Sequence, residues 1–415
     1  MGKKEHLSTD PYKGVRDFYP EDQAFFNYFA STVREVAERW GYVEYHASVL
    51  EPSELYKSKG AENEELINEQ TYTFLDRGGR EVTLRPEMTP TVARMVAARK
   101  RDMGYPLRWF SIPNLFRYER SQRGRVREHW QLNVDLFGSG SLGADAEVIA
   151  VAHAVLTAFG AEESDFTIKL GSRNFLDSII TGLKLGQEDG KKLRGLLDRR
   201  AKMPASDFER DVSDIGVALE MLSPSKVPDD VAQVLKSLAD IGITNAVFDP
   251  SIVRGFDYYT GVVFEIFDTN PENNRAMLGG GRYDNLTTLF DEEPVVGVGF
   301  GMGDVTIRDF LEVRGLLPEY APPTKVYLAL PDEALAGEAM KLAQELRAQN
   351  IATALDFGDK KLGDQIRAAS KHKIPYLIVV GADELASGMF AVRDLLTGEE
   401  KKLSREQLSS FFSTL

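Results

Sequence analysis

A proline-rich segment at residues 318–323 divides the chain into two parts with different hydrophobic patterns, and this division constrains the fold most. Before it, short apolar runs alternate with turn residues over Tyr72–Gly138, a pattern typical of antiparallel strands. After it, strand-like and helix-like segments alternate over Lys325–Val380, a pattern typical of parallel strands joined by helices. The sequence therefore predicts a separate α/β domain at residues 324–415.

A helical segment interrupts the first part of the chain. Apolar residues at three- and four-residue spacing predict a first helix from about Pro20 to Trp40. Residues 174–243 have a polar, helical pattern, whereas strand-like runs return at Gly261–Phe267 and Val295–Met302. The predicted fold class is α/β, with an α+β core of antiparallel sheet flanked by helices at residues 1–172 and 244–322, a helical insertion at 173–243, and the α/β domain at 324–415.

The composition excludes several kinds of function. The chain has 415 residues, of which 43% are hydrophobic and 27% charged, and this is ordinary for globular domains. It contains no cysteine, so disulfides, zinc–thiolate sites, iron–sulfur clusters and thiol nucleophiles are excluded together. Met1–Asp10 is polar, and no stretch approaches the roughly 18 apolar residues of a membrane span. We therefore expect a cytoplasmic protein with no membrane association.

Basic residues are concentrated in two places. The formal net charge of −14 argues weakly against a nucleic-acid partner, but Arg108–Glu128 contains six arginines and two glutamates. Guanidinium groups bind phosphate oxygens bidentately, so this run favours a polyphosphate ligand. A second basic stretch, Lys360–Lys373, has five lysines or arginines against Asp364. The alternative for each run is an ordinary solvated charged surface.

Four glycines alternate with other residues from Gly297 to Gly303. In a strand they would share one face, because side chains alternate, and that bare face would admit a flat ligand such as an adenine ring. The alternative is tight packing against a neighbouring element. These glycines do not open a βαβ unit, and Gly186–Lys191 lacks the spacing of a P-loop, so the familiar nucleotide-binding fingerprints are missing.

Three further segments carry polar chemistry at predicted strand ends. Arg85–Thr89 supplies a carboxylate and a hydroxyl suited to holding an ammonium group. Arg254–Gly261 places one arginine beside two tyrosines, for which the alternative is an ordinary place in the core, and Gly279–Asp284 exposes backbone for close contact. None of the five histidines adjoins a serine in a nucleophile-elbow setting, which argues against Ser–His–Asp catalysis.

Taken together, these segments resemble the histidyl-tRNA synthetases, a family of class II aminoacyl-tRNA synthetases, along nearly the whole chain. Arg254–Gly261 and Gly280–Asp284 resemble two signatures peculiar to the histidine enzymes. Gly14–Pro20 resembles the family's opening, and Leu50–Pro52 resembles motif 1 with its dimer-interface proline. Thr83–Thr89 resembles the amino-acid-binding strand end, and residues 116–138 resemble motif 2.

The resemblance implies activation of L-histidine by ATP to histidyl-adenylate, with Mg²⁺, and transfer to the 3′ end of tRNA-His by a homodimer that does not bind DNA. The helical insertion would contact the acceptor arm, and the C-terminal domain would read the anticodon loop. Arg117 would hold the α-phosphate and the histidine carboxylate, while Arg254 would stabilise the charge developing at the α-phosphate. Glu119 and Arg125 would lie beside ATP. Gly299 and Gly301, on the bare strand face, would also contact ATP. The implied histidine ligands are Glu87, Thr89 and Gln131 for the ammonium group, Asp135 and Tyr259 for the imidazole nitrogens, and Tyr258 and Tyr283 for the pocket wall.

Two positions depart from the family's pattern. Motif 3 usually carries an arginine for the γ-phosphate, where this chain has Thr306, and Arg308 would lie about 200° further around a helix. Asp135 stands where glutamate is frequent. The missing motif 3 arginine alone favours a second hypothesis, a non-catalytic, histidine-sensing regulatory paralogue of ATP phosphoribosyltransferase. The retained Arg117 and Arg254 favour the enzyme, as does the domain at 324–415, which that paralogue lacks.

Overall fold

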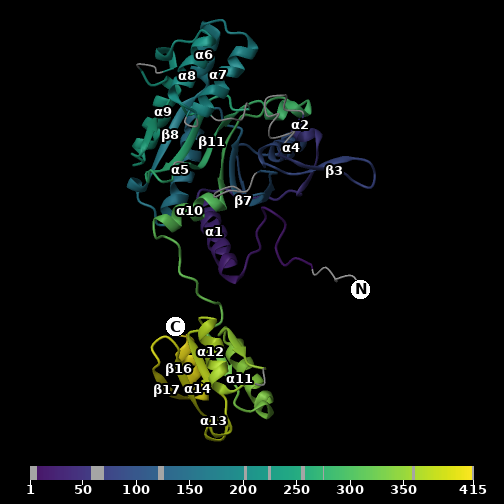
Figure 1. Cartoon of the computed structure of the whole chain (residues 1–415), viewed down its shortest axis with the longest axis vertical. Coiled ribbons are helices and arrows are strands. Elements are labelled where there is room, and N and C mark those ends of the chain that lie inside the picture. Colours follow the sequence, from purple (N-terminus) through teal and green to yellow (C-terminus); the bar gives the residue numbers. More distant parts are fainter. Residues whose placement is uncertain are drawn as a thin grey trace, which may run out of the picture. The chain divides into compact units, whose positions relative to one another are not determined.

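The chain forms two compact units, Met1–Pro318 and Glu319–Leu415, and the boundary between them in the sequence falls in the proline-rich segment (Figure 1). Each unit has its own hydrophobic core. The computed structural model describes residues 7–57, 70–119, 126–200, 203–222, 226–253, 258–273, 275–357 and 360–413.

The N-terminal unit is built on a mixed sheet to which nine strands of the described residues belong, in the order β1-β5-β7-β12-β11-β10-β8-β9 with β6 paired to β7. Pairing is antiparallel from β5 to β8 and parallel only at the two outer strands. The antiparallel sheet predicted from the sequence is therefore confirmed for the centre of this sheet. The strands are β1 Val43–Glu44, β5 Leu107–Ser111, β6 Asn114–Phe116, β7 Glu128–Phe137, β8 Phe166–Ser172, β9 Ala246–Phe248, β10 Val262–Asp268, β11 Ala276–Tyr283 and β12 Gly297–Gly303.

Helices cover one face of this sheet and form the main core with it. The first helix, α1, runs from Pro20 to Arg39, as its apolar spacing predicts, and buries Phe29 and Val33. On the sheet, alternate residues such as Val134 and Phe300 point into the same core. Because side chains alternate along a strand, the intervening residues of β7 and β12 face the opposite side. The other core helices are α5 Leu142–Ala158, α9 Asp229–Asp240 and α10 Asp304–Val313.

The helical segment between β8 and β9 has two parts. Helices α6 Arg173–Gly182, α7 Gln187–Arg199 and α8 Ala205–Asp214 share a small core of their own and lie together at one end of the unit (Figure 1). By contrast, α9 packs into the main core through Val231, Val234 and Leu238. The segment expected to be an insertion therefore contains one helix that belongs to the main core.

A second, three-stranded sheet has the order β2-β4-β3. It contains β2 Leu50–Pro52, β3 Tyr72–Leu75 and β4 Glu81–Leu84, with α2 Glu54–Lys57 and α4 Thr89–Arg99 beside it. Arg85 follows β4 and is fully buried, and its guanidinium group donates to the carbonyls of Asn114 at 3.0 Å and Ala47 at 2.7 Å. These bonds fix the turn that joins β4 to α4. Short 3₁₀ turns occur at Lys100–Asp102, Glu163–Asp165, Leu219–Leu222, Leu286–Phe290 and Glu333–Leu335.

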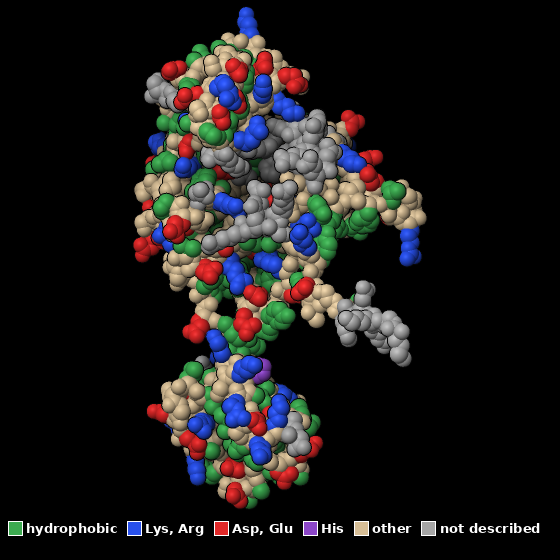
Figure 2. All heavy atoms as spheres, in the orientation of Figure 1, with side chains coloured by type: hydrophobic (Ala, Val, Ile, Leu, Met, Phe, Trp, Pro, Cys, Tyr) green, Lys and Arg blue, Asp and Glu red, His purple; other side chains and the backbone are tan. Residues whose placement is uncertain are grey.

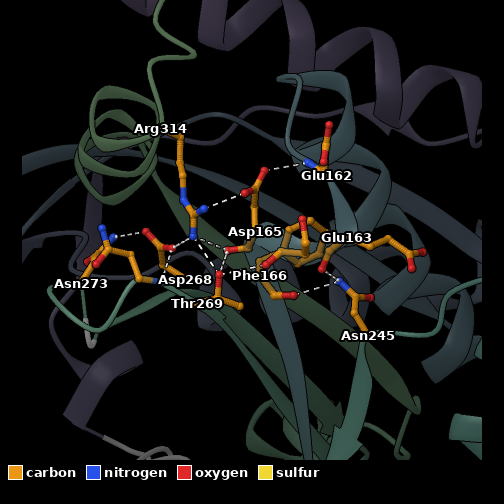
Figure 3. Close-up of polar contacts among 11 residues, drawn as sticks. Glu162, Glu163, Asp165, Phe166, Asn245, Asp268, Thr269, Asn273 and Arg314 are labelled. Carbon is orange, nitrogen blue, oxygen red and sulfur yellow. Dashed lines mark hydrogen bonds and ion pairs between the residues drawn. The ribbon is translucent and has the colours of Figure 1, made fainter.

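The end of α10 is held by Arg314, which points between two carboxylates from other elements (Figure 3). Its guanidinium group is 2.6 Å from Asp165 and 2.5 Å from Asp268, and it also donates to the Thr269 hydroxyl at 2.8 Å. Asp268 accepts a further bond from the Asn273 amide at 3.1 Å. The Asp268 side chain has no exposed surface, so Arg314 supplies the cation for a buried carboxylate.

Replacing Arg314 with leucine is expected to lower the free energy of unfolding by about 2–4 kcal/mol, because Asp268 would remain buried without its cation. Chemical denaturation of the full chain measures this change. The matched control is Arg210→Leu, since Arg210 pairs with Asp207 and Asp211 at the surface and should contribute less than about 1 kcal/mol. Equal effects of the two substitutions would contradict the assignment.

The C-terminal unit contains a five-stranded sheet, in the described residues, with the order β14-β13-β15-β16-β17. The predicted parallel strands and helices are present, but the sequence analysis missed an antiparallel hairpin formed by the last two strands. Gly398, with a φ of 78°, lies in the turn of that hairpin and was its available signal. The elements are β13 Val326–Ala329, α11 Ala336–Ala348, β14 Thr353–Leu355, α12 Leu362–Lys371, β15 Tyr376–Val379, α13 Ala382–Ser387, β16 Met389–Asp394, β17 Glu400–Ser404 and α14 Arg405–Ser413.

Candidate active site

Two adjoining cavities lie on the face of the large sheet opposite the main core. The smaller has a volume of about 110 Å³ and the larger about 260 Å³. Arg117, Gln131, Gly279 and Gly301 line both of them, so the two cavities form one continuous site.

The smaller cavity brings together the side chains that the sequence analysis assigned to histidine. They come from four places far apart in the chain: the turn between β4 and α4, strand β7, the segment before β10, and the end of β11. Asn133, which the sequence analysis missed, lies among them on β7 and could have been found from its spacing of two with its neighbours. The assigned residues in this cavity are Glu87, Thr89, Gln131, Asp135, Tyr258, Tyr259 and Tyr283.

Asp135 is the buried acid of this cavity. It is 3% exposed and accepts a short hydrogen bond from the Tyr283 hydroxyl. Burial raises the pKa of Asp135 to about 7, although the bond from Tyr283 opposes this change. The carboxyl group therefore titrates in the physiological range and is ionised above about pH 7.

Three tyrosine rings form one wall of the cavity. The Tyr258 and Tyr259 rings are 4.8 Å apart, and the Tyr258 and Tyr283 rings are 6.0 Å apart. The Tyr258 hydroxyl donates to Glu87 at 3.3 Å. This contact connects the aromatic wall to the carboxylate expected to hold an ammonium group.

The glycines of β12 leave room for side chains from the strands beside them. Gly299 is paired with Asp135 and Gly301 with Asn133. A Cβ atom on Gly299 would collide with the Asp135 carboxylate, and one on Gly301 would come within 2.9 Å of Gln131. The bare face predicted from the sequence is therefore largely covered by polar side chains of β7. Gly299 borders only the smaller cavity, whereas Gly301 also borders the larger one.

The larger cavity extends from Arg117 toward the start of α10. Two hydrogen bonds to neighbouring carbonyls hold Arg117 in place. Its backbone N–H donates to the Arg127 carbonyl at 2.9 Å, and its Nε donates to the Pro86 carbonyl at 2.9 Å. Glu119, His129 and Thr306 also line this cavity. Burial and the nearby Arg117 and Arg16 lower the pKa of His129 to about 3, so its imidazole is neutral at pH 7.

The start of α10 is fixed by the N-terminal segment of the chain. Asp304, the first residue of α10, is 2% exposed and accepts from the Arg16 guanidinium at 2.8 Å and from the Trp130 N–H at 3.0 Å. These contacts place Thr306 at the cavity wall, where its hydroxyl donates to the Met277 carbonyl at 2.9 Å. No local sequence pattern marks Asp304, because its partners Arg16 and Trp130 are remote in sequence.

Arg282 supports the other end of the site. Its guanidinium group forms a buried ion pair with Asp145 of α5 and donates to the carbonyls of Ser139 and Ser141, each at 3.0 Å. Since Arg282 directly precedes Tyr283, these bonds hold the strand end that presents the Tyr283 hydroxyl to Asp135.

Two of the predicted site residues, Arg125 and Arg254, lie outside the described residues. Arg308 does not line the larger cavity, and its guanidinium group pairs with Asp22 at 2.8 Å.

The chain is similar to known proteins along almost its whole length. The family model "Histidyl-tRNA synthetase" matches residues 14–305, and the model "Anticodon binding domain" matches residues 325–415. A histidine–tRNA ligase from Leptospira biflexa is 40% identical and covers 99% of this chain and 97% of its own. A histidine–tRNA ligase from Thermoplasma volcanium is 36% identical and covers 98% of both chains.

The solved structures agree on the fold. A histidyl-tRNA synthetase from Nostoc sp. has a TM-score of 0.82 at 22% sequence identity, covering 99% of this chain and 100% of its own. A synthetase core followed by an anticodon-binding domain defines an aminoacyl-tRNA synthetase. The chain belongs to the histidyl-tRNA synthetase family.

Proposed function

We propose that the protein is a histidine–tRNA ligase, which activates L-histidine with ATP and transfers it to the 3′ end of tRNA-His. The observation that carries this proposal is the smaller cavity, where seven polar and aromatic side chains suited to one histidine molecule converge. Glu87, Thr89 and Gln131 would hold the ammonium group, while Asp135 and Tyr259 would bind the two imidazole nitrogens. Tyr258 and Tyr283 would form the wall.

The chemistry needs positioning and charge stabilisation rather than a protein nucleophile. The histidine carboxylate attacks the α-phosphorus of ATP, the bond to the β-phosphate breaks, and pyrophosphate leaves. A ribose hydroxyl of the tRNA then attacks the activated carbonyl, and AMP leaves. Arg117 lines both cavities and is therefore suited to hold both the carboxylate and the α-phosphate, with Arg254 as a second cation for the charge that develops.

ATP would occupy the larger cavity, which Glu119 and Gly301 line, and Arg125 would be a further ligand of its phosphates. Mg²⁺ usually keeps several waters and is held by one or two carboxylates together with substrate phosphates. Glu119 is the carboxylate that lines this cavity among the described residues, and no group of three metal-ligating side chains occurs in that part of the chain. A single carboxylate fits a Mg²⁺ ion that is held mainly by the phosphates of ATP. Such an ion would neutralise phosphate charge.

Histidine-dependent ATP–pyrophosphate exchange tests the proposal, because it measures adenylate formation without tRNA. The regulatory alternative is favoured by Thr306 at the position of the motif 3 arginine, whereas the anticodon-binding match at residues 325–415 favours the enzyme. Exchange would support the ligase and show that Thr306 is compatible with ATP binding. Histidine binding in calorimetry without exchange would support the regulatory paralogue.

We further propose that the protein is a cytoplasmic homodimer. Large apolar side chains are exposed on the three-stranded sheet, where they are Leu50, Phe74 and Leu75, and Val43 is exposed on the outer strand β1 of the large sheet. A second copy would cover such side chains. Within the described residues, no helix combines the length and apolar character needed to cross a membrane. Sedimentation of the purified protein measures the oligomeric state.

The tRNA is expected to contact basic residues of the C-terminal unit and of the helical segment at 173–243. Lysine and arginine side chains are spread over the visible face of the C-terminal unit and are mixed with acidic ones (Figure 2). Binding should therefore be local and sensitive to salt, despite the net charge of −14.

Charge reversal at Lys361 and Arg367 is expected to raise the KM for tRNA several-fold and to leave pyrophosphate exchange unchanged, because both side chains are exposed on the C-terminal unit. Arg367 pairs with Asp364, so the Lys361→Glu change should have the larger effect. Steady-state aminoacylation at several salt concentrations measures it. A parallel loss of exchange and aminoacylation would contradict the assignment of this surface to RNA.

A further inference from the structure

Phe357 is an exposed aromatic side chain on the C-terminal unit. It lies two residues after β14 and is 70% exposed, although a phenyl ring gains most by burial. Other large apolar side chains exposed in the described part of this unit are Met340, Met389 and Leu396, none of which is aromatic. A single exposed ring is by itself ordinary, so its surroundings decide whether it marks a site.

The residue before Phe357 is anchored to strand β13. Asp356 donates its N–H to the Leu328 carbonyl at 3.1 Å and accepts from the Tyr327 hydroxyl at 2.6 Å. These two bonds fix the residue that directly precedes Phe357. The exposed ring therefore follows a residue that is held through both its backbone and its side chain.

Gln365 provides the second anchor and is 1% exposed. Its side-chain oxygen accepts from the Leu330 N–H at 2.8 Å, and its amide nitrogen donates to the carbonyls of Leu330 at 2.7 Å and Lys360 at 2.8 Å. The buried Gln365 amide thus connects the Lys360 backbone to Leu330, which directly follows β13. Phe357 and Lys360 are consequently presented at the same edge of the sheet.

The chemistry of this edge matches a single-stranded nucleic acid. It is the carboxyl end of the parallel strands β13, β14 and β15, where ligands of α/β sheets commonly bind. Lys360 and Lys361 are both exposed and follow Phe357 closely in the chain, so they bring positive charge to the same edge of the sheet. An aromatic face with adjacent cations is the arrangement that stacks an unpaired base and contacts its phosphates.

We propose that Phe357 stacks on an unpaired base of the tRNA anticodon loop, with Lys360 and Lys361 at the neighbouring phosphates. This inference rests on the proposed function and deepens it, because it assigns one base contact to one side chain. Stacking tolerates different bases, so Phe357 supplies affinity and orients the loop, while hydrogen bonds from other residues must select the sequence.

The test compares Phe357→Ala, Phe357→Leu and Phe357→Trp in aminoacylation of a tRNA-His transcript and in pyrophosphate exchange. The alanine and leucine variants should raise the KM for tRNA about tenfold, tryptophan should restore it to within about twofold, and exchange should be unchanged in all three. Leu396→Ala is the matched control, since Leu396 is 83% exposed on the same unit and should leave the KM unchanged.

Several results would overturn the proposal. One is a KM for tRNA within twofold of the unmodified protein in Phe357→Ala, and another is full activity of Phe357→Leu, because leucine keeps apolar bulk but not the aromatic face. An equal loss in Leu396→Ala would indicate a general effect of the surface. Failure of the proposed function is distinguishable, because the unmodified protein would then lack histidine-dependent exchange.

Discussion

Replacing Arg117 with methionine is expected to reduce histidine-dependent ATP–pyrophosphate exchange about 100- to 1000-fold while leaving the fold intact. The attacking carboxylate and the α-phosphate are both anionic, and Arg117 borders both cavities. Removing one preorganised donor to charge that develops in a transition state typically costs about this much. Methionine keeps most of the length and apolar volume, so the measured change reports the loss of the guanidinium group.

Two controls sharpen this prediction. Arg117→Lys keeps the charge but loses the fork that binds two oxygens, so its exchange rate should lie between those of the methionine variant and the unmodified protein. Arg108→Met removes an arginine of the same basic run that pairs instead with Glu147 at 2.7 Å, and its exchange rate should remain near normal. An exchange rate in Arg117→Met within tenfold of normal would contradict the assigned role.

The sequence predicted those parts of the site that depend on local periodicity. Strand β7 has a period of two, which alone places Gln131, Asn133 and Asp135 on one face, and the alternating glycines of β12 lie beside them. The interpretation of those glycines needed the structure, however, because pairing decides what covers a bare face. Their neighbours are side chains of the site itself, so the glycines provide space for polar ligands more than for a flat ring.

Contacts between distant segments could not be predicted. Arg282 and Asp145 are 137 residues apart, and the Arg16–Asp304 pair is separated by 288, so no local pattern connects either pair. For the same reason the sequence did not show that α9 belongs to the main core, since α9 has an ordinary amphipathic pattern. Only its packing against the main core distinguishes it from the neighbouring helices α6 to α8, which share a separate core.

Replacing Asp135 with asparagine is expected to raise the KM for histidine about 100-fold at pH 8. An ionised, buried carboxylate is a stronger acceptor for an imidazole N–H than a neutral amide oxygen, and such charged hydrogen bonds contribute about 1.5–3 kcal/mol. Asparagine keeps the volume and an oxygen that can accept from Tyr283. The matched control is Asp145→Asn, which alters a buried acid outside the cavity and should affect stability more than the KM for histidine.

Asp135→Asn should weaken histidine binding but make the folded protein more stable, so its effects on recognition and on folding can be told apart. The pKa of Asp135 rises from 3.8 in the unfolded chain to about 7 in the folded protein, so the folded state binds more protons between these values. Stability is therefore lost as the pH rises from about 4 to 7. Asparagine cannot ionise, so Asp135→Asn should be more stable than the unmodified protein at pH 8, and thermal unfolding at pH 5 and pH 8 measures this difference.

The same titration predicts how histidine recognition depends on pH. Below about pH 7 the free Asp135 is protonated, and binding that uses the carboxylate must first remove this proton. The KM ratio of Asp135→Asn to the unmodified protein should consequently be about tenfold smaller at pH 6 than at pH 8. Taking the ratio cancels the titration of the histidine substrate, which both proteins share. A ratio that is constant over this range would mean that Asp135 does not use its charge in recognition, and the imidazole partner would have to be sought among the tyrosines of the wall.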